Sequence, residues 1–188
     1  LFIKSDGSLH VMGFNTYGQL GTGNMVGQTS PVQIVSSGVV QIAADEQHSL
    51  FIKSDGSLWA MGRNYEGQLG TGTTTRGETS PVQIVSSGAV QIAAGRSYSL
   101  FVKSDGSLHG MGTNSSGQLG TGGTTNKQIS VIQVVSSGVV QITTGISHSL
   151  FIKSDGSLHV MGFNTYGQLG TGNMVGQTSP VQIVSSGV

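Results

Sequence analysis

The chain repeats one pattern of hydrophobic and polar positions four times. In the second copy, an apolar run over 49–53 leads into the polar pair Asp55-Gly56, and a second apolar run follows over 58–61. Asp-Gly between two such runs predicts a β-hairpin with a type I′ turn, in which both central residues take positive φ.

The predicted loop length fixes the pairing of the two strands. A two-residue loop pairs Lys53 with Leu58, and Phe51 with Ala60. Apolar side chains then lie on both faces of the hairpin. Both faces are therefore expected to be covered, as in a sheet that lies between two other sheets.

The rest of the unit predicts two more strands. A glycine-spaced connection over 62–72 contains Leu69, which is expected to fill the core. A third strand is expected over 82–85, after Pro81, because proline offers no N–H and suits a strand start or a sheet edge. A fourth strand over 89–94 leads into the next copy.

The copies recur at a nearly constant period. Phe2, Phe51, Phe101 and Phe151 hold the same place in the pattern, at spacings of 49, 50 and 50 residues. Such a period is typical of propellers and solenoids, in which each unit buries its apolar faces against its neighbours. We therefore predict an all-β fold of β-propeller blades, each of four antiparallel strands. The repeats are 1–49, 50–99, 100–149 and a truncated 150–188.

The two ends of the chain carry the same sequence. Residues 1–39 and 150–188 are identical, whereas the two middle copies differ from them and from each other. This order favours a fragment of a longer array with a super-repeat of three units. A duplicated or misassembled sequence is the alternative.

Composition excludes several kinds of partner and chemistry. Eight basic and eight acidic residues cancel, and charged residues make up 9% of the chain, so no charge footprint for DNA, RNA or an anionic membrane is present. The chain has no cysteine, which removes disulfides and thiol chemistry. Its 31 glycines favour turns over helices.

Three motifs resemble the repeat of the regulator of chromosome condensation family. They are Gly-x-x-His-Ser-Leu, Ser-Asp-Gly-Ser-Leu and Met-Gly-x-Asn-x-x-Gly-Gln-Leu-Gly, and their most specific copies are 64–70 and 145–149. The resemblance covers the whole chain and implies an incomplete segment of a seven-bladed ring, with about 3.8 repeats present. Methionine stands where the family commonly has tryptophan before glycine, and Tyr98 replaces the histidine once.

The resemblance implies functions as well as a fold. The founding member exchanges nucleotide on a small nuclear GTPase, using an inserted wedge for which the constant spacing here leaves no room. Another protein that resembles this family is a secreted β-lactamase inhibitor, which binds its enzyme through one propeller face. The resemblance thus keeps open both nucleotide exchange and plain protein binding.

The candidate chemical groups favour structural roles. Equivalent histidines lie one to a blade, too far apart to share a metal ion, and His48 and His148 are expected to bond backbone groups. Asp55 and its copies lie in turns, where short polar side chains stabilise the local backbone. Asn114-Ser115-Ser116 matches the glycosylation acceptor pattern. We therefore predict no catalytic residues, no metal site and no cofactor.

The positions that vary between copies are the candidate binding surface. Aromatic residues and arginine dominate interface energetics, and they select Arg63, Tyr65, Glu66, Arg96 and Tyr98. The leading hypothesis is a non-catalytic scaffold that binds a protein partner of unknown identity, with no nucleic acid and no membrane insertion.

Other functions and properties stay open beside the leading hypothesis. Guanine-nucleotide exchange and a propeller-based enzyme with an unrecognised site are the alternatives. Self-association through exposed blade faces is expected for an incomplete ring. The low charge and abundant Ser and Thr slightly favour an extracellular or cell-surface location.

Overall fold

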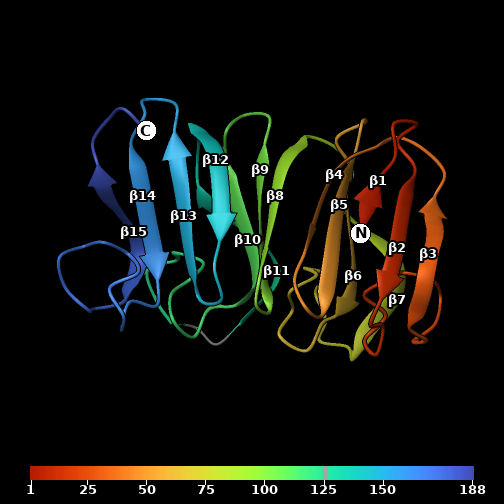
Figure 1. The fold of residues 1–188 in the computed structure, drawn as a ribbon. Coiled ribbons are helices and arrows are strands. Elements are labelled where there is room, and N and C mark those ends of the chain that lie inside the picture. The colour runs from red at the N-terminus through yellow and green to blue at the C-terminus, as the bar shows by residue number, and fades with distance from the viewer. Residues whose placement is uncertain (125–126) are drawn as a thin grey trace.

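The structure is a row of four antiparallel sheets, seen in a computed structural model that describes residues 1–124 and 127–188 (Figure 1). Blade 1 has three strands, and blades 2, 3 and 4 have four each. All regular elements of the described residues are strands. The expected all-β propeller segment is thus confirmed.

The strands follow one another in sequence order within each sheet. Blade 1 consists of β1 (Phe2–Ile3), β2 (Leu9–Gly13) and β3 (Gln28–Val35). Blade 2 consists of β4 (Val39–Ala44), β5 (His48–Lys53), β6 (Leu58–Arg63) and β7 (Gly77–Val85). Blade 3 consists of β8 (Ala89–Gly95), β9 (Tyr98–Lys103), β10 (Leu108–Thr113) and β11 (Lys127–Val135). Blade 4 consists of β12 (Val139–Thr144), β13 (His148–Lys153), β14 (Leu158–Gly162) and β15 (Gln177–Val184).

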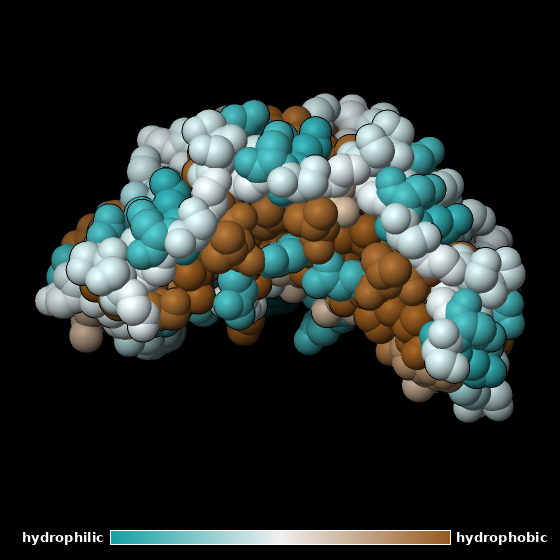
Figure 2. Space-filling model, turned by 90° about the horizontal axis from the view of Figure 1, so that it is seen from above, coloured by the Kyte–Doolittle hydropathy of each residue, from teal (hydrophilic) through white to brown (hydrophobic). Residues whose placement is uncertain are grey.

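The predicted fourth strand of each repeat opens the sheet of the next blade. The strand β8 pairs with β9, and not with the preceding β7. The first strand β8 also contacts the first strands β4 and β12 of the blades on either side. Seen from above, the four sheets form an arch with one concave side (Figure 2).

The hairpin register differs from the prediction by one residue. Phe51 pairs with Trp59, not with Ala60. Gly56 has φ 77°, and its N–H donates to Lys53 O at 2.9 Å. The turn is therefore a three-residue loop that ends in a glycine bulge, because only the glycine takes positive φ.

The third strand is longer than predicted, and its proline lies inside it. The strand β7 already begins at Gly77. Pairing with β6 passes from Val82 directly to Glu78, so Pro81 lies in a bulge where no ladder hydrogen bond is required of it. The strand β7 is also the outer strand of its sheet, the position at which proline is tolerated.

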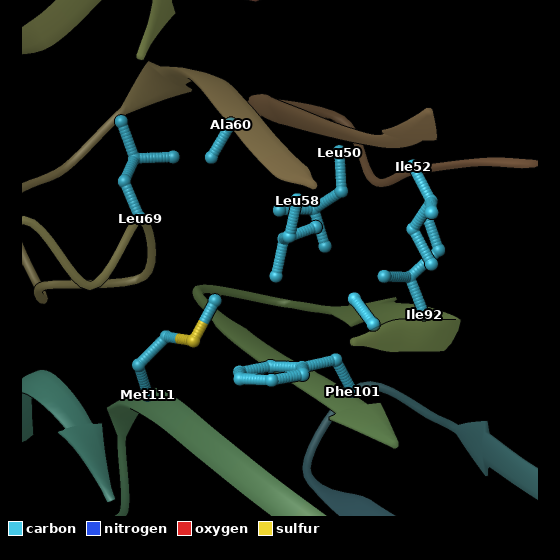
Figure 3. Packing of buried hydrophobic residues seen from close by; sticks show 9 residues of the cluster. Leu50, Ile52, Leu58, Ala60, Leu69, Ile92, Phe101 and Met111 are labelled. Carbon is cyan, nitrogen blue, oxygen red and sulfur yellow. The ribbon is translucent and has the colours of Figure 1, made fainter. Parts of the chain in front are cut away.

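Within the described residues the hydrophobic core forms three clusters, one at each junction between neighbouring blades. At the junction of blades 2 and 3, Leu50, Leu58 and Leu69 of blade 2 pack against Phe101 and Met111 of blade 3 (Figure 3). Each hairpin thus contributes leucines to the following blade and Phe and Met to the preceding one. Burial of both hairpin faces and the core position of Leu69 are confirmed.

Candidate protein-binding site

The variable residue Arg63 lies at one end of blade 2, between two tyrosine rings. Its guanidinium carbon is 5.7 Å from the ring centroid of Tyr17 in blade 1 and 5.4 Å from that of Tyr65. One guanidinium nitrogen, Nη1, donates to Gln47 Oε1 at 2.5 Å and to Ser97 Oγ at 3.4 Å. Arg63 therefore joins three blades at this end of the arch, and the aromatic rings hold its planar head group.

Tyr65 and Glu66 extend this surface toward blade 3. Tyr65 is 42% exposed. The ammonium of Lys127 donates to Tyr65 O at 3.2 Å and lies 4.0 Å from Glu66 Oε2. An exposed pair of this kind contributes at most about 1 kcal/mol to stability. These charges are therefore free to be rearranged by a partner at low cost.

Arg96 lies in the turn between β8 and β9, at the same end of the blades. Its side chain is exposed and lines an open cavity of about 450 Å³ together with Glu46 and Ile146. These three residues hold the same position in successive repeats. The structure thus brings together, around one cavity, side chains that differ from blade to blade.

The turn that carries Arg96 has an unusual backbone. Ser97 takes φ 63°, the only positive φ among the described residues other than glycine. In blade 1, Gln19 Nε2 donates to Glu46 O at 3.0 Å, but the equivalent Nε2 of Gln68 is buried without a hydrogen-bond partner in the described chain. The altered turn leaves this donor unused, beside Ser97.

Tyr98 does not belong to this surface. Its side chain is 0% exposed, and its hydroxyl donates to His148 O at 2.6 Å and lies 3.1 Å from Ser149 Oγ, both in blade 4. Burial raises the pKa of Tyr98 well above its ordinary value. A side chain without exposed area cannot touch a partner, so the predicted binding set reduces to Arg63, Tyr65, Glu66 and Arg96.

His48 holds the position of Tyr98 in blade 2 and links blades in the same way. Its Nε2 lies 2.8 Å from Ser99 Oγ in blade 3, and its Nδ1 lies 2.8 Å from Asp45 Oδ1. Burial acts to raise the pKa of Asp45, but hydrogen bonding and the charge of His48 outweigh it, so that pKa is lowered. The expectation that His48 bonds backbone groups is wrong, because its two ring nitrogens lie against the side chains of Ser99 and Asp45.

The second set of equivalent histidines, His10, His109 and His159, lies within the hairpins. His109 Nε2 lies 2.9 Å from Ser107 Oγ, and the ring stacks on Phe101 at a centroid distance of 5.0 Å. In blade 2 the equivalent position holds Trp59, and its indole N–H donates to Ser57 Oγ at 2.9 Å. An indole nitrogen can only donate, so the serine hydroxyl oxygen is the acceptor at this position. Ser107 Oγ therefore accepts from His109, whose Nε2 carries the proton.

The Asp, Ser and His that the hairpins of blades 1, 3 and 4 share do not form a catalytic triad. Ser107 Oγ donates to Asp105 Oδ1 at 2.6 Å. Hydrogen bonds from the Ser107 side chain and backbone hold the pKa of Asp105 below its ordinary value. A nucleophile needs its hydroxyl proton directed at a base of higher pKa, and Ser107 is also buried. Over residues 1–124 and 127–188, no three His, Asp or Glu side chains converge as metal ligands.

The asparagine of each glycine-spaced connection organises the loop from within. Asn64 Oδ1 accepts from Leu69 N at 3.1 Å, and Nδ2 donates to Thr71 Oγ1 and Thr73 O, each at 3.0 Å. Asn114 makes the same contacts and is 0% exposed. The glycosylation match is therefore wrong for the folded chain, because the amide nitrogen is buried and engaged.

Sequence reasoning missed part of the neighbourhood of Arg63. Tyr17 is one of the letters that vary between repeats, so comparison of the copies contained a signal for it. Gln47 and Ser97 reach Arg63 from inner turns of two blades, and Lys127 contacts a residue 62 positions away. No local pattern relates residues at such separations.

The fold and the blade contacts are those of an incomplete β-propeller. The model of the regulator of chromosome condensation (RCC1) repeat matches residues 6–52, 55–102, 105–152 and 155–188, and a second model of that repeat matches 39–68, 89–118 and 139–168. The chain therefore belongs to the RCC1 repeat family. No curated protein matched the sequence.

Solved structures agree with the family. The chain superposes on human WBSCR16 with a TM-score of 0.82 at 25% identity, covering 96% of this chain and 48% of that one. It superposes on Prp20p from Saccharomyces cerevisiae with a TM-score of 0.86 at 21% identity, covering 97% and 48%. For yeast RCC1 (Prp20) bound to Kap60 the TM-score is 0.85 at 21% identity, covering 97% and 46%. The chain thus spans about half the length of these structures.

The described residues include no helix with the length and apolar character that a membrane crossing requires.

Proposed function

We propose that this chain is a non-catalytic propeller segment that binds a protein partner through the surface formed by Arg63, Tyr65, Glu66 and Arg96. The observation that carries the proposal is the guanidinium of Arg63, held between the rings of Tyr17 and Tyr65 at 5.7 and 5.4 Å. Arginine and tyrosine fixed in this way lose little conformational entropy on binding, and such residues dominate binding energy at protein interfaces.

The different locations of the shared and the varying residues within each repeat support this surface. The letters that all copies share form the junction clusters, the turns and the loop hydrogen bonds described above. The varying residues of the proposed surface lie at one end of the strands. Arg96 and its equivalents lie in the turn before β5, β9 or β13, Arg63 is the last residue of β6, and Tyr65 and Glu66 follow it. A rigid scaffold that carries variable side chains at one end is the usual arrangement of a binding module.

The relatives support protein binding as the class of function. One solved relative is described with its binding properties to Gsp1p and histones, and another is bound to Kap60. The net charge of zero on this chain favours a protein over a nucleic acid as partner. We also propose an extracellular or cell-surface location, on the ground of the low charge and the many Ser and Thr residues.

A photo-crosslinking amino acid at position 65 tests the proposed surface. We expect one protein to be captured at position 65, to be lost when Arg63→Ala is added, and to be absent when the crosslinker stands at Lys4. Lys4 is an exposed residue of the hairpin turn at the opposite end of the strands. Equal capture of the same protein at both positions would show that this surface does not select its partner.

Family membership supports guanine-nucleotide exchange on a small GTPase as a second candidate function. It predicts that the chain accelerates release of labelled GDP from a cognate GTPase. Unchanged release rates across a panel of small GTPases would exclude it.

Self-association is a second kind of partnership that we propose, because the first and last sheets each leave one face without a neighbouring blade.

A further inference from the structure

The guanidinium of Arg63 has unused hydrogen-bond donors. A guanidinium carries five N–H groups and no acceptor. Nη1 uses its two on Gln47 Oε1 and Ser97 Oγ. The remaining three, on Nε and Nη2, have no acceptor within residues 1–124 and 127–188, and the ion pairs of the same residues do not include Arg63. Arg63 is thus held in place by its own chain without a carboxylate partner.

The unused edge of this guanidinium matches the geometry of a carboxylate. The N–H of Nε and one N–H of Nη2 run parallel along one edge of the planar group, and a carboxylate accepts both together. Nε is buried, so an acceptor that reaches it is enclosed by protein, where such a bond is stronger than in water. Tyr65, whose ring lies 5.4 Å from the guanidinium carbon and is 42% exposed, is the part of this enclosure that can move.

A second buried donor without an acceptor lies next to Ser97. Gln68 is 0% exposed, and its Oε1 accepts from Glu66 N at 3.0 Å, whereas its Nε2 has no hydrogen-bond partner in the described chain. A side-chain carbon at Gly112 would lie 3.1 Å from Gln68 Cα and 2.5 Å from Ser97 O, so Gln68 and Ser97 are neighbours. Buried donors nearly always have an acceptor. Two of them without one, on Arg63 and Gln68 at either side of Ser97, indicate an acceptor that comes from outside the chain.

Several departures from the repeat meet at this place. Blade 2 has both the arginine and Gln47, which orients it, whereas blades 3 and 4 have serine at the position of Gln47. Ser97 is the one residue other than glycine with positive φ in the described chain. The positions equivalent to Arg63 hold Phe14, Thr113 and Phe163. The arrangement around Arg63 is therefore particular to blade 2 and its contact with blade 3, and is not a property of the repeat.

We propose, on the basis of the protein-binding function proposed above, that Arg63 receives the carboxylate of an aspartate or glutamate side chain of the partner. Nε and Nη2 of Arg63 donate to the two carboxylate oxygens, and Gln68 Nε2 is a further donor. The aromatic rings already hold the guanidinium, so little conformational entropy is lost when the carboxylate binds. Arg96, exposed in the turn that also carries Ser97, adds positive charge that attracts an acidic group.

Aspartate blocked at both ends, N-acetyl-aspartate N-methylamide, tests the site without knowledge of the partner. Its titration is followed by proton–nitrogen NMR, through the signals of Arg63 Nε–H and the Gln68 side-chain amide. We expect both signals to shift saturably with millimolar affinity, and neither to shift with the neutral asparagine derivative. No shift with the aspartate derivative would overturn the proposal. An equal response to inorganic phosphate would overturn it as well, because the site would then hold any anion.

Three variants separate the geometry of the site from its charge. Arg63→Lys keeps the charge but removes the paired N–H groups, so binding reported by the Gln68 amide should weaken at least tenfold. Gln47→Ser introduces the residue that blades 3 and 4 have at this position, and it should weaken binding severalfold because Arg63 is no longer oriented. Arg76→Lys, on the exposed loop before β7, is the matched control and should leave binding unchanged. Equal binding by the wild type and Arg63→Lys would refute the paired geometry.

The protein captured at position 65 provides the second readout. Changing one of its acidic residues to the amide should weaken binding as much as Arg63→Ala does, and both changes together should weaken it no further. Fully additive losses for every acidic residue would overturn the pairing, even though capture itself supports the protein-binding function. No capture, with binding of the aspartate derivative intact, would contradict the protein-binding function and assign the site to a small carboxylate molecule instead.

Discussion

Replacing Tyr98 with phenylalanine isolates the hydroxyl that joins blade 3 to blade 4. The hydroxyl donates to His148 O at 2.6 Å, lies 3.2 Å from Gly145 O and 3.1 Å from Ser149 Oγ, and is fully buried. Phenylalanine keeps the ring, so the hydrophobic packing is retained. What is lost is the hydrogen bonding of the hydroxyl, whereas the carbonyl of His148 keeps the N–H of Gly145 as a donor at 2.8 Å.

The size of the effect follows from these contacts. A hydrogen bond contributes about 1 kcal/mol net, and His148 O keeps a second donor in Gly145 N. We therefore expect Tyr98→Phe to lower the free energy of unfolding by about 1 kcal/mol. Tyr65→Phe is the matched control, because the Tyr65 hydroxyl makes no hydrogen bond within residues 1–124 and 127–188 and the ring is 42% exposed; the expected change is below about 0.5 kcal/mol.

Urea unfolding followed by the fluorescence of Trp59, the only tryptophan, measures both variants. Circular dichroism of the same samples shows whether the sheets unfold together. If Tyr98→Phe and Tyr65→Phe prove equally stable, then the Tyr98 hydroxyl does not hold the blades together, and its assignment to the core is refuted.

Three further experiments test the Tyr98 hydroxyl, the junction of blades 2 and 3, and the loop around Asn64. Since burial raises the pKa of Tyr98, its contribution to stability is present below the ordinary tyrosine pKa of about 10 and is lost as pH rises above it; alkaline urea titrations should show a smaller loss for Tyr98→Phe than for the wild type. Met111→Ala empties part of the junction between blades 2 and 3 and should cost about 2–5 kcal/mol by the same assay, and a cost under 1 kcal/mol would contradict the packing in Figure 3. Asn64→Ala removes the three hydrogen bonds of the loop amide and should cost about 2 kcal/mol, with the exchange rate of the Leu69 amide proton rising; unchanged exchange would mean that Asn64 does not hold the loop.

The repeat and its strands were predictable because they depend on local patterns. The period of 49 or 50 residues, the apolar runs and the family motifs together predict four-stranded blades. The runs and motifs are formed by neighbouring residues, and the period appears when the copies are compared directly. The hairpin register was not predictable from the same letters. Asp55-Gly56 is compatible with a two-residue turn and with a three-residue loop, and only the φ of Asp55 distinguishes them.

The candidate site was less predictable, because variation between copies has two causes. Arg63 and Arg96 vary at the surface, where each blade presents a different side chain. Tyr98 varies because the position it shares with His48 spans two blades, and either side chain can bond a group in the next one. The sequence does not separate these causes, since the groups that receive the bond lie about fifty residues away.

The binding claim is tested most directly by the affinity of the partner captured at position 65 for wild-type and variant chains. We expect Arg63→Ala to weaken binding at least thirtyfold, the loss that corresponds to a contribution of about 2 kcal/mol or more. Tyr98→Phe, which lowers stability but changes no surface atom, should leave the affinity of the folded chain unchanged. Equal affinities for the wild type and Arg63→Ala would contradict the claim that the letters that vary between blades carry the function.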